Sequence, residues 1–142
     1  MSCSTKSPGD DAIGTARDFH STFGYVVIGA NGFAGLVALL AWATPSLRGR
    51  WVWVVTIAAE AALLLEVVLG VVVEASDRYA AERFHLFYGF VAFLTVGLAY
   101  QYRDSFRGGG DAPAWRTMEM FYGLVGLFLM GLGIRAVIEG MA

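Results

Sequence analysis

The chain has 142 residues, of which 57% are hydrophobic and only 15% are charged, and its formal net charge is −2. A water-soluble domain of this size needs more polar surface to cover its core, so the composition excludes an ordinary soluble protein. The apolar residues form four long uninterrupted blocks, without the alternation that a membrane barrel strand requires. We therefore expect an integral membrane protein whose spans are all α-helical.

The first segment, residues 1–18, is rich in Ser, Thr, Gly and Asp. This composition predicts a flexible polar N-terminal tail, and the segment lacks the apolar stretch that is typical of a signal peptide. The single cysteine, Cys3, lies in this tail and has no partner for an internal disulfide.

The rest of the chain, residues 19–142, is predicted to form one transmembrane domain. The predicted helices are 19–42, 51–73, 84–100 and 118–138. At the α-helical rise each is about 25 to 36 Å long, which matches a hydrocarbon core of about 30 Å. Because the connections are short, neighbouring helices should be antiparallel, and we expect an up-down four-helix bundle.

The chain also contains an internal repeat. The segment Phe19–Ala34 matches Phe84–Ala99 at a constant offset of 65, with six identities in sixteen positions. The second helices agree less well, although Leu69-Gly70 resembles Leu132-Gly133. The bundle is therefore predicted to consist of two repeated helix pairs, related by an axis along the membrane normal.

The repeat places the only two histidines, His20 and His85, at equivalent positions and hence at the same depth. Each is followed four residues later by a glycine, Gly24 or Gly89, on the same helical face. An imidazole beside a glycine suits a b-type haem, because the imidazole ligates iron and the missing side chain lets the macrocycle approach the backbone. We expect one haem between the two histidines, with Arg135 among the arginines that pair with its propionates.

Other interpretations of these residues stay open. Histidines near a membrane interface also serve as anchors, and glycines in membrane helices also permit close helix packing. Zinc is less favoured than haem, because two histidines give too few ligands for a tetrahedral site.

Charged residues inside the spans are a second signal, because each is expensive to bury in lipid. Glu66 is predicted to point into the bundle, either as a proton-handling or quinol-binding group or as an ion-pair partner of Arg135. Glu60 lies about 120° away around the same helix, so we expect it to face lipid or a partner subunit. Glu119 is expected near the opposite interface, in contact with solvent.

Aromatic residues favour an orientation. All four tryptophans lie at the membrane face that carries the first and third loops, at positions 42, 51, 53 and 115. Basic residues are only slightly more frequent at that face. We expect a multi-pass protein of a bacterial plasma membrane with both termini outside.

One family resemblance adds to this interpretation. The segment Glu66–Gly70, followed by a short loop and then His85, resembles one half of a haem A synthase, a membrane family built from two related four-helix bundles with paired histidines. The chain is also similar to four-helix b-type cytochromes. The resemblance covers about Glu60–Tyr100 and implies haem at His85, and the repeat extends this to His20. The chain has one bundle and two histidines, whereas the full synthase has two haem sites.

The sequence thus predicts a membrane b-type cytochrome that holds haem b and exchanges electrons with a quinone or a partner protein. One alternative is a cofactor-free accessory or assembly subunit of a larger, respiratory membrane complex. Another is a small transporter or channel, although all three prolines lie outside the predicted spans. The expected partners are the lipid bilayer and either complex subunits or further copies of the chain; no nucleic acid and no catalytic residue are predicted.

Overall fold

The computed structural model describes residues 8–76, 83–103 and 114–140, and these residues contain helices and no strand. The four long helices are α1 (Pro8–Ala43), α2 (Arg50–Ala75), α3 (Arg83–Tyr102) and α4 (Ala114–Gly140). A short 3-10 helix, η1 (Pro45–Leu47), joins α1 to α2. The predicted all-α fold with four helices is confirmed.

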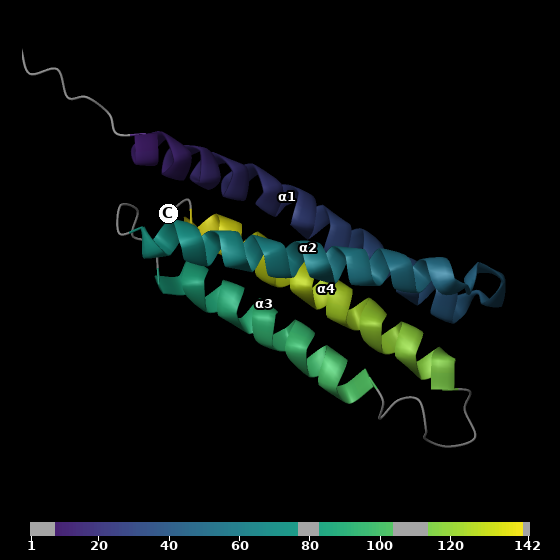
Figure 1. The fold of residues 1–142 in the computed structure, drawn as a ribbon. Coiled ribbons are helices and arrows are strands. Elements are labelled where there is room, and N and C mark those ends of the chain that lie inside the picture. Colours follow the sequence, from purple (N-terminus) through teal and green to yellow (C-terminus); the bar gives the residue numbers. More distant parts are fainter. Residues whose placement is uncertain (1–7, 77–82, 104–113, 141–142) are drawn as a thin grey trace, which may run out of the picture.

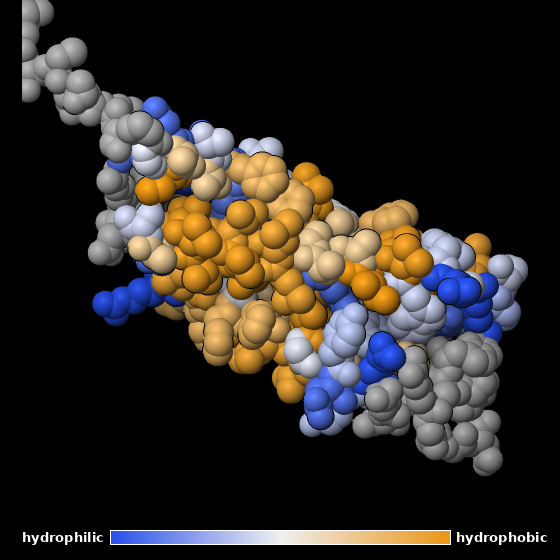
Figure 2. Space-filling view, viewed as in Figure 1, coloured by the Kyte–Doolittle hydropathy of each residue, from blue (hydrophilic) through white to orange (hydrophobic). Residues whose placement is uncertain are grey.

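All four helices are long and apolar enough to cross a membrane. Large hydrophobic side chains are exposed along every one of them, for example Phe33 at 60%, Val54 at 65% and Phe84 at 62%. Figure 2 shows these side chains as a broad apolar belt in the middle of the molecule, with polar residues towards both ends. An apolar surface of this extent is the surface that a multi-pass membrane protein presents to lipid.

Consecutive helices run in opposite directions (Figure 1). The beginnings of α1 and α3 and the ends of α2 and α4 lie at one end of the bundle, which we call the histidine face. The ends of α1 and α3 and the beginnings of α2 and α4 lie at the other end, the tryptophan face. Helix α1 packs against both α2 and α4, whereas α3 packs mainly on α4 and only lightly on α2.

The closest helix contact joins α1 to α4 through buried glycines. A Cβ atom on Gly126 would lie 2.8 Å from the Cα of Gly35, and one on Gly35 would lie 2.9 Å from the carbonyl oxygen of Gly123. A side chain at these positions would meet backbone, so only glycine permits this approach. Gly123 and Gly126 of α4 thus permit close packing, whereas a Cβ on Gly131 would meet nothing within 4 Å.

The central core draws on all four helices. It consists of Val27, Leu63, Ala92, Val96 and Leu129, each at most 6% exposed. On the tryptophan side of this core, the buried Asn31 amide donates to the carbonyl oxygens of Val27 and Ala59. This pair of bonds ties α1 to α2 and satisfies an amide that would otherwise be expensive to bury.

Helix α1 begins eleven residues earlier than predicted, because it starts at Pro8. The predicted flexible tail is therefore wrong for residues 8–18, and residues 1–7 lie outside the described part. Pro8 is tolerated in a first helical turn, and Asp10 and Asp11 interact favourably with the helix dipole there. At 36 residues the helix is about 54 Å long, so its polar first turns extend beyond the hydrocarbon core.

At the tryptophan face, Arg48 connects the end of α1 to the start of α4. Its guanidinium donates to the carbonyl oxygens of Ala41 and Trp42, and its Nε lies 3.4 Å from Glu119 Oε2. The Glu119 side chain is only 4% exposed, so the expectation that it contacts solvent is wrong. The short turn around η1 brings a cation over this carboxylate, which makes its burial tolerable.

Candidate functional site

The site lies at the histidine face and begins with His20 on α1. His20 Nδ1 lies 2.9 Å from Glu66 Oε1 on α2, and the two side chains are 19% and 13% exposed. The separation is that of a hydrogen bond, but the ring N–H is not aligned with the oxygen, so we describe the contact as a close polar pair. The alternative in which Glu66 pairs with Arg135 is wrong, because Glu66 contacts His20 and Arg135 pairs with Glu139.

Two glycines make room for this pair. A Cβ on Gly24 would lie 3.0 Å from Glu66 Oε1, and a Cβ on Gly70 would lie 3.0 Å from His20 Cε1. Gly24 therefore accommodates the carboxylate of Glu66, a different role from the predicted one of accommodating a macrocycle. Gly70 supports the imidazole ring directly.

The second histidine, His85 on α3, is held by backbone. Its Nδ1 lies 2.9 Å from the carbonyl oxygen of Ala136 on α4. A carbonyl oxygen can only accept, so Nδ1 carries the proton in the neutral ring and Nε2 keeps its lone pair. Gly140 backs the ring, because a Cβ there would lie 3.1 Å from His85 Nδ1.

The two imidazole rings meet at the centre of the site. Their centroids are 5.9 Å apart, and the ring planes are perpendicular. The structure therefore brings the two sequence-predicted histidines together from α1 and α3. The Nδ1 bond of His85 to a carbonyl oxygen is the arrangement that orients a histidine to bind a metal through Nε2, whereas His20 Nδ1 has a carboxylate nearby without an aligned bond.

A large cavity of about 870 Å³ adjoins the two rings. All four helices line it, and its floor includes Val27, Leu63 and Leu129 of the central core. Its lining also includes the exposed Val71 of α2 and Phe90 of α3, so it opens towards lipid between these two helices. Its size falls within the range of about 300 to 1,000 Å³ for pockets that hold small molecules and cofactors.

Gly89 and Arg135, the other predicted site residues, differ in their relation to the cavity. Gly89 lines it, and a Cβ there would meet nothing within 4 Å, so this glycine faces open space. Arg135 is not among the lining residues; its side chain is 55% exposed, and it lies 3.1 Å from Glu139 and 5.9 Å from the ring centre of Tyr88. Arg17, three residues before His20, is the arginine that lines the cavity.

Sequence reasoning missed Arg17, Gly70 and Gly140 as site residues. Arg17 could have been found, because residues three apart share a helical face. The contacts of Gly70 and Gly140 with the imidazoles depend on how α2 and α4 are placed against α1 and α3, for which the sequence carries no local signal.

Across the described ranges, no group of three or more His, Cys, Asp and Glu side chains is arranged to hold a metal ion. The two imidazole rings are the nitrogen ligands that the site brings together. Two imidazoles that bind one ion through nitrogens at about 2 Å have centroids roughly 6 Å apart, and the observed spacing is compatible with such a pair.

Comparisons with known proteins identify no relative of this chain. No family model, no curated protein and no solved structure matches the chain. The description of the site therefore rests on the residues themselves.

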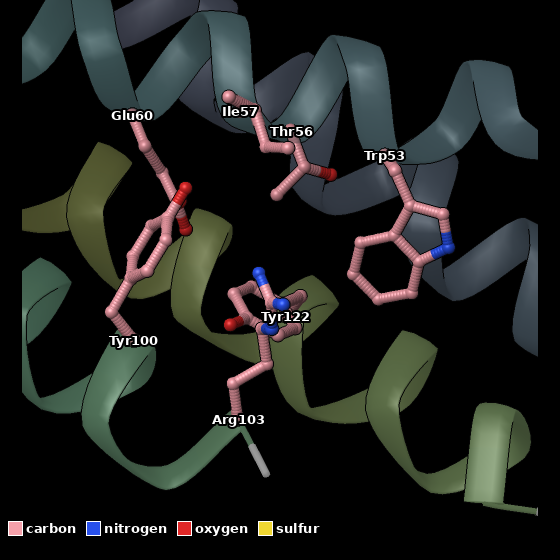
Figure 3. A pocket seen from close by; sticks show the side chains of 7 residues that line it. All are labelled: Trp53, Thr56, Ile57, Glu60, Tyr100, Arg103 and Tyr122. Carbon is pink, nitrogen blue, oxygen red and sulfur yellow. The ribbon is translucent and has the colours of Figure 1, made fainter. Parts of the chain in front are cut away.

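Glu60 lies outside this site, in the half of α2 towards the tryptophan face. Its side chain is buried at 3% exposure and lines a second, small cavity with residues of α3 and α4 (Figure 3). The expectation that Glu60 faces lipid or a partner subunit is therefore wrong. It shares an inward direction with Ala59, which is buried and whose carbonyl oxygen accepts from Asn31 of α1.

Proposed function

We propose that this protein is a membrane b-type cytochrome that binds one haem between His20 and His85. The observation that carries the proposal is the perpendicular pair of imidazole rings with centroids 5.9 Å apart beside a cavity of about 870 Å³. Bound there, haem would supply one-electron redox chemistry at its iron.

Different residues of the chain would bind different parts of the haem. His20 and His85 would hold the haem through ring nitrogens, and Glu66 beside His20 and the Ala136 carbonyl beside His85 would position the two rings. Held by two histidines, the haem would supply electron transfer in preference to oxygen binding. The apolar floor would exclude water, and Arg17 at the cavity wall would pair with an acidic edge group.

The opening between α2 and α3 supports a partner in the same membrane. A quinone is a lipid-soluble electron carrier and could approach the cavity through this opening, past Val71 and Phe90. The weak haem A synthase resemblance points to the same cofactor, through Glu66–Gly70 and His85. It supports haem binding and carries no claim of synthase activity.

An absorption spectrum tests the proposal. We expect protein produced with haem available, and purified in detergent, to show a Soret band and a sharp α-band after reduction with dithionite. His20→Ala and His85→Ala should each lose most of the haem. Thr95→Ala is the matched control, because the Thr95 hydroxyl bonds only to its own helix and lies outside the cavity lining.

A colourless wild-type protein that is folded and monodisperse would contradict the cytochrome. If that colourless protein co-purified with other membrane subunits, the accessory-subunit function would replace it. Haem retained equally in all four proteins would contradict ligation by the histidines.

A further inference from the structure

Glu60 is a buried carboxyl group that has no role in the proposed cytochrome. It lies ten residues from the start of α2, about 15 Å along the helix and hence near the middle of the span. Neither of its carboxyl oxygens has a hydrogen-bond partner in the described residues. An ionised carboxylate in this setting would be very expensive, so the neutral acid is the form that fits the site.

The cavity beside Glu60 is small and its surface is mostly apolar, with Thr56 and Tyr122 among the lining residues that carry polar groups. Its volume of about 20 Å³ exceeds the roughly 10 to 15 Å³ that a single water needs. The Thr56 hydroxyl donates to Val52, so its oxygen keeps lone pairs that can accept, and the Glu60 carboxyl group offers a second polar partner. A water there would find the two to four polar partners that an internal water requires.

The cavity lies on the tryptophan side of the central core, and its lining includes the exposed Ile57 of α2. Arg103, which follows the end of α3 at the tryptophan face, contributes to its lining together with Tyr100, which is 45% exposed. Figure 3 shows the Glu60 carboxyl group directed towards the ring of Tyr100. The side chains of Arg103 and Tyr122 lie farther from Glu60 in the same view. On the other side, Leu63 belongs to the apolar core that separates Glu60 from the histidines.

We propose that Glu60 and this cavity form a proton-binding site, in which an internal water connects the carboxyl group to the tryptophan face. A proton from bulk water at that face forms an O–H bond with one carboxylate oxygen. Release breaks the same bond and returns the proton to the same face. The site does not depend on the proposed haem.

The groups around Glu60 are compatible with this role. The titratable or charged side chains that face it are Tyr100 and Arg103 from α3 and Tyr122 from α4. From α1 the neighbouring polar group is the Asn31 amide, which does not titrate and already donates to Ala59. None of these side chains hydrogen-bonds to the Glu60 carboxyl group, so its oxygens remain able to bind a proton.

Infrared spectroscopy of the full-length protein in detergent tests the proposal. At neutral pH we expect a carbonyl band of a protonated carboxyl group that shifts in D2O and disappears in Glu60→Gln. Glu119→Gln is the control: its carboxylate pairs with Arg48, so its loss should leave the band intact. If Glu60→Gln does not fold, carbon-13 labelling of the glutamate carboxyl groups should shift the band, and Glu66→Gln and Glu119→Gln should each retain it. Among the described glutamates with buried oxygens that lack a hydrogen-bond partner, this leaves Glu60 as its source.

Three results would overturn the proposal. The absence of a protonated-carboxyl band would mean that Glu60 is ionised. A band that persists in folded Glu60→Gln would belong to another residue. A Glu60 band that does not shift in D2O would show that the carboxyl group has no water connection to either face.

Discussion

At the scale of single residues, the sequence was informative about the histidines and less so about their neighbours. The repeat predicts that His20 and His85 lie at one depth, and their rings are 5.9 Å apart. The partner of Glu66 could not be predicted, because His20 and Arg135 are both within reach of a long side chain in a bundle. Only the packing of α1 on α2 decides between them.

The His20–Glu66 pair leads to a redox prediction. A carboxylate at Nδ1 makes an axial imidazole more basic and stabilises the oxidised iron. We therefore expect Glu66→Gln to raise the haem midpoint potential. A tenfold change in the relative stability of the oxidised and reduced haem corresponds to about 59 mV for one electron. A redox titration measures this shift. Glu139→Gln, outside the cavity lining, should leave the potential unchanged, and an equal shift in both variants would contradict the assignment.

Gly89 gives a second test at this scale. A Cβ there would meet nothing within 4 Å, so Gly89→Leu should leave the fold stable but fill the space beside the haem. We expect loss of most bound haem with little change in thermal stability. Gly131→Leu is the matched control, because Gly131 is equally open but does not line the cavity. Normal haem content in Gly89→Leu would place the macrocycle elsewhere.

At the scale of helices, the apolar blocks predict four spans, and each helix extends beyond its predicted ends. The extension is largest for α1, because hydropathy marks what lies in lipid and does not show where a helix continues into water. The directions of the charged α2 and α4 side chains were also mispredicted. Glu60 and Glu119 are both buried, since helix rotation in a bundle is set by close packing at sites such as Gly35 and Gly126.

The α1–α4 contact predicts a large effect of a side chain at Gly126. A Cβ would lie 2.8 Å from the backbone of Gly35, so Gly126→Val must separate the helices. We expect a loss of at least about 1 to 3 kcal/mol, the usual range for overpacking. Reversible unfolding in mixed detergent measures it. Gly97→Val, at an exposed position with open space, should be close to neutral; equal losses would contradict this contact.

The Arg48–Glu119 pair leads to a prediction of a similar loss in the free energy of unfolding. Removing the cation in Arg48→Gln leaves a carboxylate that is 4% exposed without its charge partner, which typically costs about 3 to 5 kcal/mol. Arg48→Gln combined with Glu119→Gln should lose less than Arg48→Gln alone. A double-mutant cycle on the same unfolding assay decides this, and strictly additive losses would mean that the pair is not coupled.

At the scale of the whole molecule, composition alone predicts a membrane protein, while its orientation stays a prediction. The α1–α2 turn and the N-terminal segment lie at opposite faces of the bundle, since a single span separates them. If both termini are outside, a membrane-impermeant maleimide should label Cys3 in intact cells. Ser46→Cys in a Cys3→Ser background, at an exposed position of η1, should be labelled only after lysis. The reverse pattern would invert the orientation.

The most direct test of the cytochrome is the spin state of its iron. Two histidines at the axial positions should give the oxidised wild-type protein a low-spin electron paramagnetic resonance spectrum, with one haem per chain. In His20→Ala or His85→Ala we expect either a high-spin signal or loss of the haem. A high-spin wild type, or a low-spin signal that survives both substitutions, would contradict a haem held between His20 and His85.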